Sequence, residues 1–343
     1  FVSEKSAYVT FNGGDNVVQL KPGHKHALGT GADLVVFDKQ ITSAGGTLTT
    51  GNYYLTEDLY LFSNHLTITG NVNLCLGGNR LESTRSGPVI TVKSGAVLNI
   101  CDCNSGERIH SFRAPSNDGQ TPAAGMWVLG SNPYEGEIIT LVSGGVITGG
   151  GQGSLGHGGG VFNEGSFTMY GGSIIGNGMN SNLTTISGGG VHNDGTFTIY
   201  GGSITNNSAV TGGGVYMNSG AFTLSGSPVV SGNAGNNVYI PNGKIITVSA
   251  PLTTGASIGV ATYDLPSAGA YVPITGTNDA NYSRYFSSDN TDYQVCNENN
   301  TVKLKVKSPH EHSFTCNLAA STSTYYTVTA ICTNADCDLA DGS

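Results

Sequence analysis

Charged side chains are scarce in this chain of 343 residues, of which only 11% are Asp, Glu, Lys or Arg. An average soluble protein carries about 25%, so this surface must be built mainly from Ser, Thr, Asn and Gly, as is typical of extracellular proteins. The 14 basic and 23 acidic residues give a net charge of −9. No cluster of Lys or Arg is available to neutralise phosphates, which argues against a nucleic acid as partner.

Long apolar runs are also missing. None reaches the roughly 18 residues of a transmembrane helix, so we expect no membrane insertion in this fragment. The first residues, FVSEKSAYVT, lack the charged and apolar regions of a signal peptide. We expect the chain to be an excised or matured piece of a longer secreted protein, extracellular or on the cell surface, with its signal and anchor outside this fragment.

What the chain has is glycine, 52 residues in all, and a repeated phrase. The phrase reads GGGVFNEGSFTMYGGSII from Gly158, GGGVHNDGTFTIYGGSIT from Gly188 and GGGVYMNSGAFTLSGSPVV from Gly212. The triplets are 30 and then 24 residues apart. Periods of about 20 to 50 residues are the mark of solenoids, propellers and arrays.

Apolar and polar residues alternate within each repeat, which predicts a short half-buried strand. A glycine corner follows, then a second apolar stretch and an Asn/Gly turn, with no room for a helix. The repeats show neither the helix formers nor the leucine consensus of leucine-rich and ankyrin repeats, nor the turn Asp of a calcium β-roll. They therefore predict an all-β, right-handed parallel β-helix in which Phe167, Phe197 and Phe222 form an internal aromatic ladder.

Less regular stretches upstream, including ITLVSGGVIT from Ile139, indicate further coils. We predict a β-rich N-terminal cap over residues 1–45, a parallel β-helix over 46–260, a C-terminal β-hairpin cap over 261–307, and a small, partial Cys/His module over 308–343. At roughly 25 residues a coil, the helix would have about eight or nine turns.

Several phrases resemble a known group of proteins. They include GGGVHNDGTFTIYGGSITNN, LTTGNYYLTEDLYL, ITVKSGAVLNICDC and YFSSDNTDYQV, and they cover most of residues 45–305. These resemble the glycine-rich right-handed β-helix surface proteins of Gram-positive gut bacteria. The resemblance implies secretion, a parallel β-helix and a place in a modular surface protein. It carries no catalytic residues across.

The C-terminal tail combines histidines and cysteines around a β-like YYTVTAI run. His310 or His312, with Cys332 and Cys337 and with or without Cys316, would supply the N and S ligands of a structural zinc site, although the spacing matches no standard finger. A local disulfide between Cys332 and Cys337 is the alternative. The tail also resembles short HxH…C…C segments between the domains of such surface proteins.

The seven cysteines are an odd number, so at least one is free, metal-bound or paired outside the fragment. Cys75 and Cys101 lie at similar points of consecutive coils and suit either a reduced, buried ladder or a disulfide. Cys103 and Cys296 have no obvious partners.

A polysaccharide lyase or glycoside hydrolase is the alternative to a binding module, since both chemistries need converging carboxylates and a base or acid. The best candidates for catalytic residues lie near a segment that we expect to overhang the coil as a loop after Cys101. They are Glu82, Asp102, Glu107, Arg108 and His110. Their alternative reading is an ordinary solvated loop. We assign Glu164 and Asp194, by contrast, to turns.

Outward aromatic columns are the best candidates for ligand binding. Phe162, His192 and Tyr216 take equivalent positions in successive repeats, and Tyr170 lies above Tyr200. Such rings either stack on sugars or shield sheet edges. We therefore expect a monomeric, secreted or cell-surface module for adhesion, glycan binding or spacing, whose partner is an extracellular glycan or a host or cell-surface component.

Overall fold

The structure is a computed structural model that describes residues 8–12, 17–21, 24–28, 34–41, 45–62, 65–83, 87–106, 108–113, 128–129, 139–151, 158–178, 187–277, 282–307, 314–320 and 326–332. The chain divides into two units, Phe1–Lys305 and Val306–Ser343, and each is described by itself.

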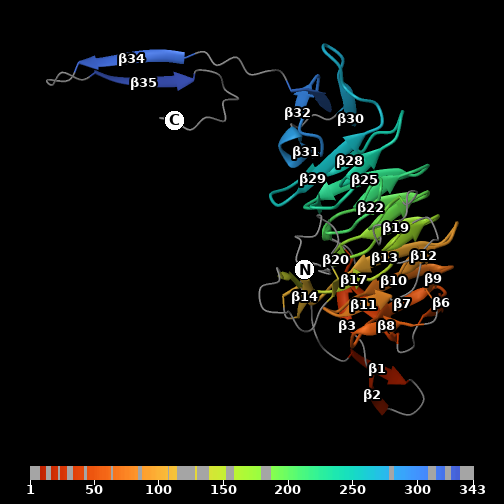
Figure 1. The fold of residues 1–343 in the computed structure, drawn as a ribbon. Coiled ribbons are helices and arrows are strands. Elements are labelled where there is room, and N and C mark those ends of the chain that lie inside the picture. Colours follow the sequence, from red (N-terminus) through yellow and green to blue (C-terminus); the bar gives the residue numbers. More distant parts are fainter. Residues whose placement is uncertain are drawn as a thin grey trace. The chain divides into compact units, whose positions relative to one another are not determined.

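The first unit is an all-β parallel solenoid of about seven turns, which confirms the predicted fold class (Figure 1). Each complete turn gives one strand to each of three parallel ladders. The first ladder consists of β5 (Lys39–Gln40), β7 (Gly51–Tyr54), β10 (Asn71–Cys75), β13 (Val97–Cys101), β19 (Ser166–Met169), β22 (Thr196–Ile199), β25 (Ala221–Gly226) and β28 (Thr247–Leu252).

The other two ladders meet at β29 (Ser257–Thr262), which pairs with the last strand of each. The second ladder consists of β8 (Leu59–Leu61), β11 (Arg80–Ser83), β17 (Val146–Thr148), β20 (Ser173–Ile175), β23 (Ser203–Thr205) and β26 (Val229–Ser231). The third consists of β6 (Gly46–Leu48), β9 (Leu66–Ile68), β12 (Ile90–Val92), β18 (Val161–Asn163), β21 (Val191–Asn193), β24 (Val215–Met217) and β27 (Val238–Ile240).

The number of turns is smaller than the predicted eight or nine because the chain leaves the solenoid after β13. There β14 (Ile109–Arg113) pairs antiparallel with β15 (Val128–Leu129) and β16 (Ile139–Ser143). The chain rejoins the second ladder only at β17. The ITLVSGGVIT stretch, predicted to be one coil, is therefore half insert and half coil. Phe112 of the insert is fully buried against Val146 and Ile175, so the insert packs on the outside of the second ladder.

Part of the core is made of identical side chains stacked in register. Phe167, Phe197 and Phe222 are all buried. Their ring centroids are 4.7 and 5.1 Å apart, with interplanar angles of 2° and 18°. The predicted aromatic ladder is thus confirmed. It forms because parallel in-register pairing brings like residues to the spacing of neighbouring strands, about 4.8 Å.

Asparagine side chains form another in-register stack, which runs along the ladder of strands from β17 to β26. Asn177, Asn207 and Asn233 are almost fully buried. The Nδ2 of Asn177 donates to Asn207 Oδ1 at 3.0 Å, and the Nδ2 of Asn207 donates to Asn233 Oδ1 at the same distance. Each Nδ2 also donates to a main-chain carbonyl of the preceding coil, as Asn207 does to Ile174 at 2.9 Å. Buried polar atoms at these turns are therefore satisfied by the preceding and the next coil.

Glycine is required where consecutive coils approach most closely. A Cβ atom on Gly213 would lie 1.8 Å from the carbonyl oxygen of Ala234 in the next coil. No side chain fits there, so the glycine triplet sets the spacing between coils.

Antiparallel strands lie before and after the coils. On the N-terminal side, β1 (Tyr8–Asn12) pairs with β2 (Val17–Lys21), and β3 (His24–Ala27) pairs with β4 (Leu34–Phe37). On the C-terminal side, β30 (Val272–Thr277), β33 (Thr301–Val306) and β32 (Tyr293–Glu298) form a sheet. The strand β31 (Phe286–Ser288), preceded by the short helix η1 (Ser283–Tyr285), instead pairs parallel with β29. Ile274, Val302 and Leu304 extend the apolar core beyond the last coil.

In the described part of the second unit, β34 (Phe314–Ala320) pairs antiparallel with β35 (Tyr326–Cys332). In this pair Cys316 lies opposite Ala330, and Cys332 lies opposite Phe314.

Candidate functional site

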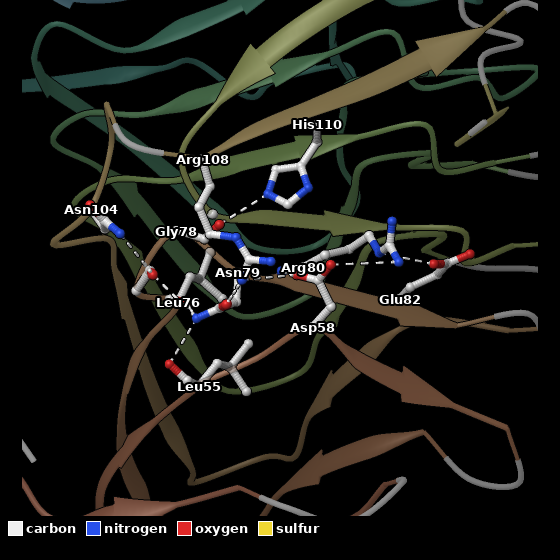
Figure 2. Close-up of polar contacts among 12 residues, drawn as sticks. Leu55, Asp58, Leu76, Gly78, Asn79, Arg80, Glu82, Asn104, Arg108 and His110 are labelled. Carbon is white, nitrogen blue, oxygen red and sulfur yellow. Dashed lines mark hydrogen bonds and ion pairs between the residues drawn. The ribbon is translucent and has the colours of Figure 1, made fainter. Parts of the chain in front are cut away.

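The predicted catalytic residues that the structure describes lie near one turn of the solenoid but are occupied with structural contacts. Glu82 is on β11, and its Oε2 lies 3.2 Å from Nε of Arg80. Nη2 of Arg80 lies 3.7 Å from Oδ2 of Asp58. Figure 2 shows Arg80 between the two carboxylates. The guanidinium group also lies 4.7 Å from the ring centroid of Tyr60.

The carboxyl group of Glu82 has a raised pKa. Burial is the main cause, the nearby charge of Asp58 adds to it, and Arg80 opposes it. A raised carboxyl pKa suits a general acid, but two carboxylates that act on a sugar must both reach the scissile bond. Here both carboxylates are ion-paired with the same guanidinium group.

Arg108 and His110 hold the turn between β10 and β11. Nη1 of Arg108 donates to Oδ1 of Asn79 and lies 3.5 Å from Oδ1 of Asp58. His110 is buried, and its Nε2 lies 3.0 Å from the carbonyl oxygen of Gly78 (Figure 2). The side chain of Asn79 in turn donates to the main-chain carbonyls of Leu55 and Leu76.

Asp102 fixes the point where the chain leaves and re-enters the solenoid. Its Oδ1 accepts the main-chain N–H of Gly78 at 2.7 Å, and its Oδ2 accepts that of Gly145 at 2.7 Å. Both oxygens are thus bound to backbone, and the side chain is 5% exposed. Glu107 lies outside the described residues. The structure therefore brings Asp102, Arg108 and His110 to the Gly77–Asn79 turn, with Glu82 linked through Arg80 and Asp58.

Sequence analysis missed Asp58 and Arg80 as members of this cluster. Their main chains stack in consecutive coils, and the N–H of Arg80 donates to Oδ1 of Asp58 at 2.9 Å. Asp58 and Arg80 are 22 residues apart. Because this is close to the length of one coil, the spacing could have predicted that they stack.

A surface groove lies next to this region, where the first ladder turns into the second. It has a volume of about 430 Å³. Its lining combines tyrosine rings, glycine corners and serine hydroxyls from consecutive coils. The lining residues are Asp102, Ser105, Ser143, Tyr170, Gly171, Gly172, Ser173, Tyr200, Gly201, Gly202, Ser203, Ser227 and Val229.

Tyr170 and Tyr200 form the aromatic part of the groove. Their rings are stacked, with centroids 5.0 Å apart and an interplanar angle of 6°. Tyr200 is 42% exposed. In the next coil the corresponding position is Ser225, which is buried and carries no ring. The second face of Tyr200 therefore has no aromatic neighbour in the repeat.

The hydroxyl group of Tyr170 remains neutral. Burial is the main reason that the pKa of Tyr170 is raised, and Tyr200 and Cys101 add to the effect. Tyr170 therefore keeps its proton at neutral pH and can donate a hydrogen bond. Oγ of Ser203 donates to Oγ of Ser173 at 2.8 Å, which aligns two hydroxyls along the groove.

The second aromatic column lies on the third ladder. Phe162, His192 and Tyr216 are in register, and the column continues to Tyr239, which the sequence analysis missed. The sequence VYI at residues 238–240 could have revealed it, because Tyr239 takes the same place after valine as Tyr216 does in VYM. Neighbouring ring centroids are 5.2–5.7 Å apart.

His192 departs from the expected exposed column, because it is only 2% exposed. Its Nδ1 lies 3.0 Å from Oγ of Ser187, and its Nε2 lies 3.6 Å from Oδ2 of Asp194. Phe162 and Tyr216 are half-buried. This column is therefore interrupted by a buried, hydrogen-bonded imidazole, which leaves the groove at Tyr170 and Tyr200 as the better candidate for a ligand site.

The zinc prediction falls largely outside the described residues. His310, His312 and Cys337 are not among them, and Cys332 is described only as part of strand β35. Within the described ranges, no group of three or more His, Cys, Asp or Glu side chains is arranged to hold a metal ion.

No helix in the described part of the chain is long and apolar enough to cross a membrane. Comparison of the chain with protein-family models, with curated proteins and with solved structures found no match. The proposal for function therefore depends on the groove.

Proposed function

We propose that the chain is a secreted or cell-surface binding and spacing module whose groove at Tyr170 and Tyr200 binds an extracellular glycan. The observation that carries the proposal is a pair of stacked tyrosine rings in a hydroxyl-lined groove of about 430 Å³. That volume is within the range of about 300–1,000 Å³ that is usual for ligand sites.

The groove offers the two kinds of contact that a sugar needs. The ring face of Tyr200 that has no aromatic neighbour can stack on the apolar C–H face of a pyranose. Serine hydroxyls of neighbouring coils, such as Ser173, Ser203 and Ser227, can exchange hydrogen bonds with the sugar hydroxyls. Because these groups repeat along the solenoid axis, the groove suits an extended chain rather than a single sugar.

The charge of the groove favours a neutral glycan. No Lys or Arg is among the described residues that line it. Its one carboxylate, Asp102, has both oxygens bonded to main-chain N–H groups. A uronic acid or sialic acid would bring a charge that these described lining residues have no cation to receive.

The test is a glycan array of plant and mucin glycans, followed by calorimetry with the strongest ligand. We expect neutral glycans to bind, and we expect Tyr200→Ala to weaken binding about tenfold or more. Tyr200→Phe keeps the ring face and should cost about threefold at most. Tyr239→Ala is the matched control, since Tyr239 is stacked on Tyr216 outside the groove.

An array without any bound glycan would refute the proposal, as would unchanged binding by the double variant Tyr170→Ala, Tyr200→Ala. The length of the glycan is measured before and after incubation with the protein. A binding module returns the glycan intact, whereas the alternative proposal, a polysaccharide lyase or glycoside hydrolase that uses Glu82, shortens it in a way that Glu82→Gln abolishes.

A further inference from the structure

Two cysteines from consecutive coils meet beside the groove. Cys75 ends β10 and is fully buried, whereas Cys103 lies two residues past the end of β13 and is partly exposed. Their Sγ atoms are 3.4 Å apart. A disulfide needs a separation of about 2.05 Å, so the two sulfurs must approach by a little more than 1 Å.

The backbone around Cys103 is held in the conformation that allows this contact. Asp102 Oδ1 accepts the N–H of Asn104 at 3.3 Å as well as that of Gly78. These bonds on the residue before and the residue after Cys103 anchor the bend that turns it back toward Cys75. An apolar cluster that includes Phe37 and Tyr54 surrounds the cysteines.

We propose that Cys75 and Cys103 are an oxidative modification site, at which an intramolecular disulfide links the second and third coils of the solenoid. The reaction takes a small disulfide, such as oxidised glutathione, as oxidant. The bond closes a loop of 28 residues, and it is distinct from the in-register pair Cys75 and Cys101 that the sequence suggests.

The exposure of the two thiols sets the order of steps. The thiolate of Cys103 attacks one sulfur of oxidised glutathione, which breaks the S–S bond, forms a mixed disulfide and releases one glutathione thiolate. Cys75 then attacks the sulfur of Cys103 and releases the second glutathione. The two protein thiols lose two electrons and two protons, and the oxidant gains them as two thiols. Burial raises the pKa of Cys75, which is consistent with Cys103 reacting first.

Cys101 is the competing partner, because it pairs in register with Cys75. Its Sγ points to the main-chain oxygen of Leu74, at 3.6 Å. The matched variants Cys101→Ala and Cys103→Ala therefore separate the two assignments. They are necessary because no Lys or Arg lies between residues 101 and 103, so one tryptic peptide carries both cysteines.

The experiment treats the full chain with glutathione buffers of increasing oxidised fraction. It then maps disulfides by mass spectrometry after alkylation, and it measures Tm. We expect a link between the peptides of residues 75 and 103 in the wild type and in Cys101→Ala, with the mass of two hydrogen atoms lost. Closing a loop of this length should raise Tm by roughly 5 °C. Cys103→Ala should show neither change.

A link that persists in Cys103→Ala and is absent from Cys101→Ala would overturn the proposal. The proposal would also fail if Cys75 of the folded wild type stayed a free thiol in the most oxidising buffer. In that case the alkylating reagent would still label Cys75 once the protein is denatured. Circular dichroism of each variant establishes that it is folded. If Cys103→Ala is not, Cys103→Ser takes its place, since a hydroxyl is tolerated at a partly exposed position.

Discussion

Single polar residues in this solenoid act mainly as hydrogen-bonding partners of neighbouring coils. Asp102 accepts hydrogen bonds from three main-chain N–H groups, and the side chain of Asn79 donates to three main-chain carbonyls. Asp194, predicted to be a turn residue, accepts hydrogen bonds from Asn218 at 2.6 Å and from Ser219 at 3.0 Å in the next repeat. The polar side chains that most resemble catalytic residues in the sequence therefore connect consecutive turns of the solenoid by hydrogen bonds.

Asp194 makes the stability of the fold depend on pH. Burial opposes its ionisation, but the hydrogen bonds from Asn218 and Ser219 and the proximity of His192 outweigh burial and lower its pKa below the usual 3.8. A carboxyl group whose pKa is lowered by folding stabilises the protein above its unfolded-state pKa. That stabilisation is lost as the pH falls through the folded-state value.

Asp194→Asn should therefore cost about 1 kcal/mol in the free energy of unfolding above about pH 5. The difference from wild type should shrink as the pH falls below 3.8. Urea denaturation at a series of pH values measures this difference in the free energy of unfolding. A difference that stays constant from neutral pH to the acid limit would contradict this assignment.

The sequence predicts inward residues better than outward ones. Phe167 and its equivalents are correctly placed in the core because alternation within a strand fixes which side faces inward. His192 is in an outward phase, yet it is buried because Ser187 and Asp194 fold against its ring. Alternation cannot register such a contact, since it comes from the loops before and after the strand rather than from the strand itself.

At the scale of elements, the ladders of like residues stabilise the coils in two different ways. The phenylalanine ladder removes apolar surface from water, whereas the ladder of Asn177, Asn207 and Asn233 satisfies main-chain groups that the turn would otherwise bury without partners. A half-buried ladder on the first sheet, Asn52, Asn73 and Asn99, has similar side-chain bonds of 2.6 and 2.8 Å.

The two asparagine ladders should differ in energetic weight. Asn207→Ala leaves the carbonyl of Ile174 and the N–H of Asn177 buried without this partner, and we expect a loss of about 3 kcal/mol. Asn99→Ala, on the half-buried ladder, should cost about 1 kcal/mol or less. Urea titration gives the free energy of unfolding of each variant. Equal losses would show that burial does not determine how much each asparagine stabilises the fold.

The insert between β13 and β17 explains why the sequence overestimated the number of coils. The β16 strand has the alternation of a coil strand, and nothing local distinguishes the two. What differs is its partner: β16 pairs antiparallel with β14 instead of parallel with a coil. Pairing direction is a property of the folded topology. The contact of Asp102 with Gly145 could not be predicted for the same reason, because Gly145 lies 43 residues away at the far end of the insert.

At the scale of the whole solenoid, each coil touches mainly its two neighbours, so stability is expected to be distributed along the axis. The sequence determines this organisation clearly, since the triplets of glycine recur where the coils approach. Gly213 shows why, because any larger residue would collide with the carbonyl of Ala234.

Gly213→Ala should therefore destabilise locally, by roughly 2–3 kcal/mol. Hydrogen exchange should accelerate at the amides bonded across this contact, namely those of residue 213 and Gly214, and should stay unchanged at Leu76 several coils away. Gly106→Ala is the control, since no atom lies within 4 Å of its added Cβ. Uniform acceleration along the chain would mean that the solenoid unfolds as a single cooperative unit.

The in-register stacking of like residues also bears on how such a chain changes length during evolution. Val161 faces Val191, which faces Val215, and Phe167, Phe197 and Phe222 follow the same order. If recombination between the near-identical repeats removed residues 188–211, Val161 would meet Val215 and Phe167 would meet Phe222. Both contacts are of kinds already present. The gene can therefore gain or lose whole coils by unequal crossing-over without inventing a new interface, and only the distance that the module spans would change.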